Sequence, residues 1–176
     1  KPYQPEGVWA DFSFGNKRYQ PDTGAALYRR SLYTFWRRII GPTMFFDASR
    51  RQSCVVKSAR TNTPLHALAT LNDVTYIEAA RALAERALNA SRDPKERIAH
   101  AFQWSTGRLP NHDEFDILMT RLERSIEAFS KAPAEAASLL AEGASKSGSD
   151  LDLVEHAAYT NICSLILNLD ETLSKQ

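Results

Sequence analysis

The sequence predicts an all-α fold: an orthogonal multi-helix bundle with a long extended N-terminal arm and one long ordered loop. Glycine is scarce, at 7 of 176 residues, whereas the helix-favouring residues Ala, Leu, Glu and Arg are abundant. After residue 62, apolar side chains recur at helical spacing between N-cap and Pro signals. Strand-like patterning is confined to the short run Cys54-Val55-Val56. We therefore expect one helical domain over 1–176, as part of a larger protein.

The first 24 residues are expected to form the extended arm. Pro and Gly recur along this segment and interrupt regular structure, whereas its aromatic residues argue against disorder. Free aromatic side chains would make a sticky patch, so Trp9 and Phe12 or Phe14 should pack on helical surface.

A basic helix and a loop are expected over 25–62. The pattern predicts a helix over 25–40 with one apolar sector, formed by Tyr28, Leu32, Phe35, Trp36 and Ile39. Gly41-Pro42 ends this helix, because Pro cannot continue it. Residues 41–62 then form the long loop, and long ordered loops are often functional.

The helical body is expected over 63–173. Its helices begin at N-cap residues that are followed by Pro or by a first-turn acid, as at Thr63-Pro64, Asp93-Pro94 and Asn111. The first runs from Pro64 to an interruption at Asn72-Asp73, and the others cover 74–90, 94–105, 112–131, 133–142 and 151–173. Ser149 or Asp150 caps the last helix, after a Gly/Ser/Lys loop over 143–149.

Helical spacing also predicts which side chains of the body point inward. The expected core residues include Leu65, Leu68 and Leu71 in the first helix, Ile98 and Phe102 in 94–105, Phe115, Leu118, Leu122 and Ile126 in 112–131, and Ile162, Leu165, Ile166 and Leu169 in 151–173.

Charge is distributed unevenly, although the net charge is only +1. Residues 17–60 hold ten basic and two acidic side chains, whereas residues 61–176 hold eleven basic and seventeen acidic ones. One interpretation is internal complementarity, with a basic helix and loop docking on an acidic body; the other is an anion site on the basic segment. The acidic body and the lack of a recognised motif argue against nucleic acid. No apolar run approaches the ~20 residues that span a bilayer.

Motifs for catalysis and metal binding are missing from the sequence. Cys54 and Cys163 are far apart and lack metal, redox or haem-attachment spacing, so we expect two buried thiols or, in an exported protein, one disulfide. The four histidines are not paired at metal-ligand spacing. Neither a nucleophile elbow nor a phosphate-binding glycine motif is found. We therefore expect no metal and no cofactor, and assign no catalytic residue.

Four residues form the candidate ligand-binding site: Arg30, Asp47, Arg60 and Asn62. Arg60 and Asn62 precede the Thr63-Pro64 helix start, beside the positive end of a helix dipole, where anions bind readily. Asp47 is one of only two acids in the basic segment, so we expect it to accept charge-assisted hydrogen bonds from nearby arginines. The structural alternative is that these residues only pair with one another and punctuate the change from loop to helix.

Several longer motifs resemble a known family. They are the Tyr28-Arg29-Arg30-Ser31 to Phe35-Trp36-Arg37 run, the Phe46-Asp47 to Arg51 and Cys54 loop, Arg60-Thr61-Asn62-Thr63-Pro64-Leu65, Leu71-Asn72-Asp73, Gly107-Arg108-Leu109-Pro110 and Leu167-Asn168-Leu169-Asp170-Glu171. With these motifs the chain resembles, over nearly all of its length, the C-terminal part of a planctomycete-specific domain of unknown function. That domain lies at the C-terminal end of large exported proteins that often also carry a cytochrome c-like domain. The chain departs from the family at His66, where Gln is usual, and at Lys57, where Arg is usual.

The resemblance implies an exported location and a multidomain parent, but no established activity. The leading interpretation is a non-catalytic docking or ligand-binding domain that contacts other domains of the same parent. The alternative is part of an enzyme active site for an anionic or carbohydrate substrate, completed by the N-terminal half of the family domain that this chain lacks. A third interpretation, an electron-transfer accessory, follows only from the haem-containing neighbours of the family.

Overall fold

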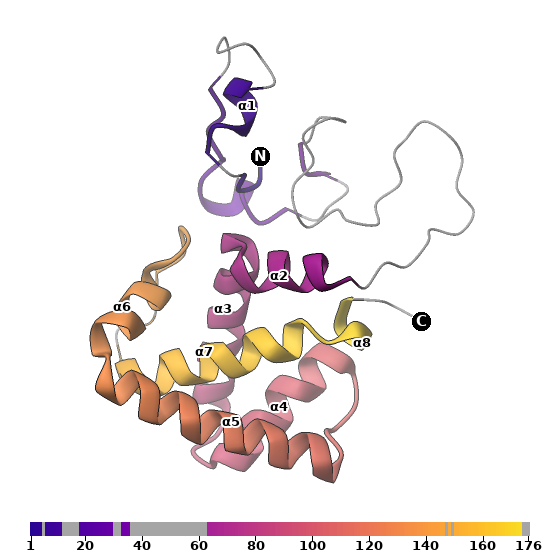
Figure 1. Ribbon diagram of the computed structural model, residues 1–176, viewed down its shortest axis with the longest axis vertical. Coiled ribbons are helices and arrows are strands. Elements are labelled where there is room, and N and C mark those ends of the chain that lie inside the picture. The colour runs from indigo at the N-terminus through magenta and orange to yellow at the C-terminus, as the bar shows by residue number, and fades with distance from the viewer. Residues whose placement is uncertain are drawn as a thin grey trace, which may run out of the picture. The chain divides into compact units, whose positions relative to one another are not determined.

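The computed structural model describes residues 1–4, 6–11, 18–29, 33–35, 63–146, 148 and 150–173. Within these ranges every regular element is helical, which confirms the all-α class (Figure 1). The elements are α1 (Val8–Asp11), the 3-10 helix η1 (Gly24–Ala26), α2 (Pro64–Asn72), α3 (Val74–Ala90), α4 (Pro94–Thr106), α5 (His112–Lys131), α6 (Pro133–Ala141), α7 (Leu153–Leu167) and α8 (Asp170–Leu173). The chain divides into two compact units, Lys1–Thr70 and Leu71–Gln176. A single domain over 1–176 stays a prediction.

The second unit is built around α7, which packs on α3, α4, α5 and α6. Figure 1 shows α5 lying alongside α7 and running in the opposite direction, while α3 crosses α7 steeply. Three alanines, Ala80, Ala84 and Ala87, lie on the face of α3 toward the core, and their small side chains allow a close approach of the neighbouring helix. The largest contributions to the core come from Leu88, Ile98, Phe102, Leu122, Tyr159, Ile162 and Ile166, each at most 6% exposed.

The N-cap signals that define the body helices are confirmed. Asp73 accepts a hydrogen bond from the amide of Thr75 at 2.9 Å, and Asp93 accepts one from Lys95 at 3.0 Å. Asn111 and Glu114 form a reciprocal capping box at the start of α5. As a result α3 and α5 have the bounds that the sequence predicts, and α4 is one residue longer.

The last helix differs from its predicted range of 151–173. It begins one residue after Asp152, whose carboxylate accepts from the amide of Glu155 at 2.8 Å, so neither Ser149 nor Asp150 is the cap. It ends at Leu167, and the C-cap residue Asn168 leaves the helical conformation with φ −93 and ψ 2. The apolar spacing continues through this break, and the sequence pattern alone did not reveal it.

Charged residues on α3 hold the loop that follows α6. The Arg81 side chain is only 2% exposed. It donates to the carbonyl oxygens of Leu140 at 2.5 Å, Glu142 at 2.6 Å and Ser145 at 2.7 Å. Glu78, one turn earlier, accepts from the Ser145 amide at 2.6 Å and lies 3.5 Å from Arg81. The Gly/Ser/Lys loop is therefore fixed to the body at its described residues. Arg81 also satisfies carbonyls at the C-terminal end of α6, where a cation is favoured.

In the first unit, the aromatic residues pack on one another. Trp9, in α1, is buried and stacks on Tyr19 with ring centroids 5.1 Å apart and on Phe35 at 5.9 Å. Its indole nitrogen donates to the Gln4 side chain. Trp9 is buried, but the expectation that it packs on helical surface is wrong in these contacts, because its stacking partners are aromatic side chains of its own unit. The single turn of α1 also interrupts the arm that was expected to be extended throughout.

The helix expected over 25–40 is not formed at the positions that the structure describes. Gly24–Ala26 form a 3-10 turn there, Tyr33 also has 3-10 conformation, and 34–35 lie outside any helix. Tyr28 and Phe35, expected to point inward, are 53% and 47% exposed. The segment is rich in aromatic residues, which are only moderate helix formers. Its amphipathic spacing alone was therefore not enough to predict a helix. The loop over 41–62, Phe12 and Phe14 lie outside the described residues.

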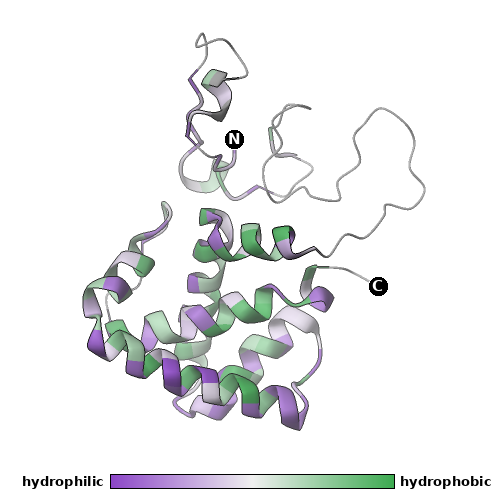
Figure 2. Cartoon of the chain, viewed as in Figure 1, coloured by the Kyte–Doolittle hydropathy of each residue, from purple (hydrophilic) through white to green (hydrophobic). Residues whose placement is uncertain are grey.

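The N-cap of α2 is confirmed, but its inward face is not the expected one. The hydroxyl of Thr63 accepts from the amide of His66 at 3.2 Å. Leu65, Leu68 and Leu71 are 74%, 60% and 38% exposed, whereas His66 and Thr70 are buried. Figure 2 shows that most of α2 is hydrophobic, so its pattern holds more than one apolar face and does not decide which face is buried.

Candidate functional site

The four ligand-binding residues predicted from the sequence, Arg30, Asp47, Arg60 and Asn62, lie outside the described residues. Their grouping in one pocket stays a prediction. The helix start beside them is described, since Thr63 caps α2.

An open groove in the second unit is the candidate site. It has a volume of about 430 Å³ and lies between the first half of α5 and the C-terminal end of α7. Its lining is mainly apolar: Phe102, Ile117, Leu118, Leu165, Ile166 and Leu169, with Glu114, Arg121 and Asn168 as polar members. Three of these apolar residues are exposed, with Ile117 at 63%, Leu165 at 37% and Leu169 at 36%. The groove thus presents to solvent apolar surface that the core does not use.

The position of the groove follows from the helix pattern. On α5, the lining residues Glu114, Ile117, Leu118 and Arg121 are spaced i, i+3, i+4 and i+7, so they form one stripe. The neighbouring stripe of α5 packs into the core. Leu165 and Leu169 were expected to point inward, but both are exposed and lie at the edge of the groove.

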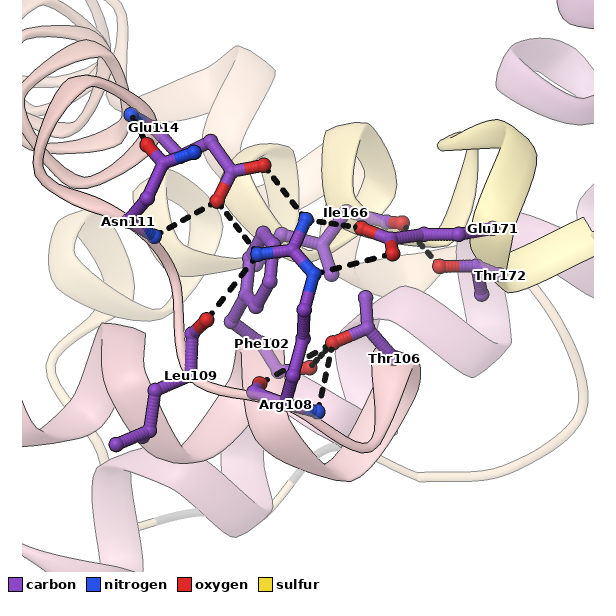
Figure 3. A network of polar contacts seen from close by, with 9 residues as sticks. All are labelled: Phe102, Thr106, Arg108, Leu109, Asn111, Glu114, Ile166, Glu171 and Thr172. Atoms are coloured by element: carbon purple, nitrogen blue, oxygen red, sulfur yellow. Dashed lines mark hydrogen bonds and ion pairs between the residues drawn. The ribbon is translucent and has the colours of Figure 1, made fainter.

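An arginine braces one end of the groove. Arg108 donates two hydrogen bonds to the Glu114 carboxylate, at 2.8 and 2.7 Å, and two to Glu171, at 3.2 and 2.6 Å (Figure 3). Its guanidinium carbon lies 4.9 Å from the centroid of the Phe102 ring, which is a cation–π distance. This one side chain therefore connects α4, α5 and α8 at the end of the groove.

The pKa shifts of Arg108 and Glu114 show that each group stabilises the charged form of the other. The hydrogen bonds from Arg108 and, second, from the Asn111 amide lower the pKa of Glu114 to about 2. The same carboxylates raise the pKa of Arg108 above its ordinary value, Glu114 contributing most. Glu114 is thus ionised at neutral pH and already bonded, which makes it a poor general acid or base.

Among the described residues, the thiol and the metal-ligating side chains form neither an activated nucleophile nor a metal-ligand cluster. Cys163 is a free, fully buried thiol, and burial raises its pKa, so it is not a ready nucleophile. In the part of the chain that the structure describes, no three His, Cys, Asp or Glu residues gather as metal ligands. The mainly apolar lining of the groove suits the binding of apolar groups.

A second hollow, of about 570 Å³, lies in the first unit. Its lining mixes aromatic and polar residues: Gln4, Glu6, Trp9, Arg18, Tyr19 and Gln20. Trp9, the largest ring there, is already stacked on Tyr19 and Phe35. Trp104 in the second unit is occupied as well, since it stacks with His100 at 5.4 Å and carries Arg86 at 3.9 Å over its ring. Neither ring is an unoccupied platform on which a ligand ring would stack.

Arg108, Glu114 and Arg121 were not among the site residues predicted from the sequence. Gly107-Arg108-Leu109-Pro110 contributed only to the family resemblance, and Glu114 only to the cap signal at Asn111. A signal was nevertheless there: Gly107 has φ +84 and ends α4, which directs the chain so that Arg108 faces the next cap. The acidic Glu171, 63 residues later, had no local signal.

No helix among the described residues has the length and apolar character needed to cross a membrane.

Comparisons with known proteins identify the family. Neither the curated proteins nor the solved structures contain a significant match to the chain. Residues 1–122 match the family described as PSD1, protein of unknown function (DUF1553). The match covers the N-terminal unit and α3 to the middle of α5, whereas the expected resemblance extended over nearly the whole chain. This chain belongs to the PSD1 family of proteins of unknown function (DUF1553).

Proposed function

We propose that this chain is a non-catalytic docking domain whose α5–α7 groove receives an apolar segment from another domain of the same parent protein. The observation that supports it is the exposure of Ile117, Leu165 and Leu169 in one groove with a polar rim. Exposed apolar surface of this kind, gathered in a concave site, typically marks a place where a partner binds. The braced Arg108 network supports a groove that is formed before the partner arrives.

A partner within the same parent suits the modest size of the groove. The planctomycete-specific, exported, multidomain proteins that this sequence resembles place such a domain at their C-terminal end. A tethered segment has an effective concentration in about the millimolar range, so a small contact area is sufficient. The export of the parent belongs to this proposal, and so does the anion site at Arg30, Asp47, Arg60 and Asn62.

The test uses the part of the parent that precedes this chain. That part is expressed separately, labelled, and titrated with this chain. Ile117→Glu places a charge on the exposed wall of the groove and should weaken binding by about tenfold or more, since interface centres are sensitive to such changes. Thr120→Glu is the control, because Thr120 is also exposed on α5 but does not line the groove. Equal binding by the Ile117→Glu and Thr120→Glu proteins would contradict the proposal.

A further inference from the structure

The groove is about two helical turns long on its α5 side. Glu114 and Arg121 lie at its ends and are seven residues apart, which is ~10 Å along the axis of an α-helix. Ile117 and Leu118 lie between them and provide the apolar wall. A partner helix that lies along this wall therefore meets apolar surface over two turns and a charged residue at each end.

The two charged ends are not equivalent. The carboxylate of Glu114 accepts two hydrogen bonds from Arg108 and a third, at 2.8 Å, from the Asn111 amide. Arg108 therefore already occupies this end as its cation, and one guanidinium against two carboxylates leaves a net charge of 1 − 2 = −1 there. A carboxylate of a partner is disfavoured at this end.

Arg121 is in the opposite situation. It is exposed, and among the described residues it has no ion pair and no hydrogen bond. Its neighbours at i±3 and i±4 on α5 are Ile117, Leu118, Arg124 and Ser125, so no carboxylate lies where an intrahelical pair would form. The guanidinium has five N–H donors and accepts no hydrogen bond. The Arg121 guanidinium therefore offers the groove a positive charge and hydrogen-bond donors.

We infer that the segment received by the groove is an amphipathic helix whose apolar face is flanked by a carboxylate that pairs with Arg121. This inference rests on the proposed docking function and adds the charge of the partner to it. An apolar helix in a groove uses anchors at i, i+3, i+4 and i+7. Ile117, Leu165 and Leu169 are exposed apolar side chains of the groove. They favour a helix over a single alkyl chain, because an alkyl chain would leave much of their apolar surface in water.

The experiment uses two fluorescent helical peptides and the full chain. Both peptides have Leu at i, i+3, i+4 and i+7; one carries Glu and the other Lys at the positions that flank this face. Anisotropy titrations should show the Glu peptide binding about tenfold more tightly than the Lys peptide at low salt, with the difference shrinking as salt screens the pair. Arg121→Glu should reverse the preference. Arg92→Glu, at an exposed arginine outside the groove lining and away from Arg121 in the sequence, is the matched control and should retain it.

The outcomes separate this inference from the proposed function. If both peptides bind equally and Ile117→Glu abolishes both, the groove docks apolar segments but the assignment of an acidic partner is wrong. If neither peptide binds, the assignment of an amphipathic helix is wrong. The separate titration with the preceding part of the parent protein then tests the docking function independently. If dodecanoate competes fully with the Glu peptide and binds Arg121→Glu less tightly, the occupant is an amphiphile rather than a helix, which also overturns the inference.

Discussion

Arg108 and Glu114 form a two-pronged ion pair across the turn between α4 and α5, with N···O distances of 2.8 and 2.7 Å. Glu114 also completes the capping box of Asn111, so the start of α5 and the end of the groove depend on the same carboxylate (Figure 3). The pair links a local helix signal to the shape of the candidate site.

Replacing Arg108 should therefore change the titration of Glu114. In Arg108→Ala the Glu114 carboxylate keeps the Asn111 amide but loses the bonds that contribute most to its low pKa, so its pKa should rise from about 2 toward its ordinary value. Carboxyl-carbon NMR against pH measures this change directly. Arg121→Ala is the control and should leave the Glu114 titration where it is. An unchanged Glu114 pKa in Arg108→Ala would contradict the described pair.

Arg81 should be among the residues whose loss costs most stability. Arg81→Ala removes a buried guanidinium, takes the cation away from the Glu78 carboxylate and deprives the carbonyls of Leu140 and Glu142 of their donor. Breaking a buried pair in this way costs about 3–5 kcal/mol of unfolding free energy. Urea denaturation measures the loss, with the exposed Arg92→Ala as a control that should change stability by less than about 0.5 kcal/mol. Similar stability in the two variants would show that Arg81 does not fix the loop.

Gly143, in the loop that follows α6, should tolerate a side chain less well than Gly107. Its φ of +87 is left-handed, and a Cβ there would lie 2.7 Å from Cδ of Glu78. Gly107 has nearly the same φ, +84, but a Cβ there would meet nothing within 4 Å. Gly107→Ala should cost only the backbone strain, about 1–2 kcal/mol, and Gly143→Ala should cost more because Glu78 must also move. Thermal unfolding of both variants compares them, and an equal or smaller cost at Gly143 would be inconsistent with the described loop.

His156 should make stability depend on pH. It is buried in α7 at 1% exposure, and its ring Nε2 lies 3.4 Å from the carbonyl oxygen of Arg81. Burial lowers the pKa of His156 below its ordinary 6.5, so the folded state binds its proton less readily than the unfolded state does. Stability from this residue is present above about pH 6.5 and is lost as the pH falls through that value toward the folded pKa. Unfolding free energies from about pH 7.5 to pH 5 should fall less steeply in His156→Gln than in the wild type. Parallel curves would contradict the assignment.

The body helices could be predicted from the sequence because their signals are local. Asp73, Asp93 and Asn111 each mark a helix start within a few residues, and the structure places a cap at every one of them. The core positions of α4 and α5 follow from helical spacing in the same way, as Ile98 and Leu122 show.

The candidate site could not be predicted in this way, because its contacts join distant parts of the chain. Arg108 meets Glu171 63 residues later, and Arg81 meets Ser145 64 residues later. Spacing also assigns a stripe without deciding whether it is buried, which is why the leucines of α2 and Leu165 were assigned to the core and are exposed. The spacing of apolar residues identifies one face of a helix, but the packing of the neighbouring helices decides whether that face is buried.

The most direct measurement is methyl NMR of the groove during binding. The chain is labelled at Ile and Leu methyl groups, and the unlabelled preceding part of the parent protein is added. The docking proposal predicts that the largest shift changes occur at Ile117, Leu118, Leu165, Ile166 and Leu169, which line the groove, and that Ile98 and Leu88 in the core change little. Shift changes that are absent, or that centre on residues outside the groove, would contradict it.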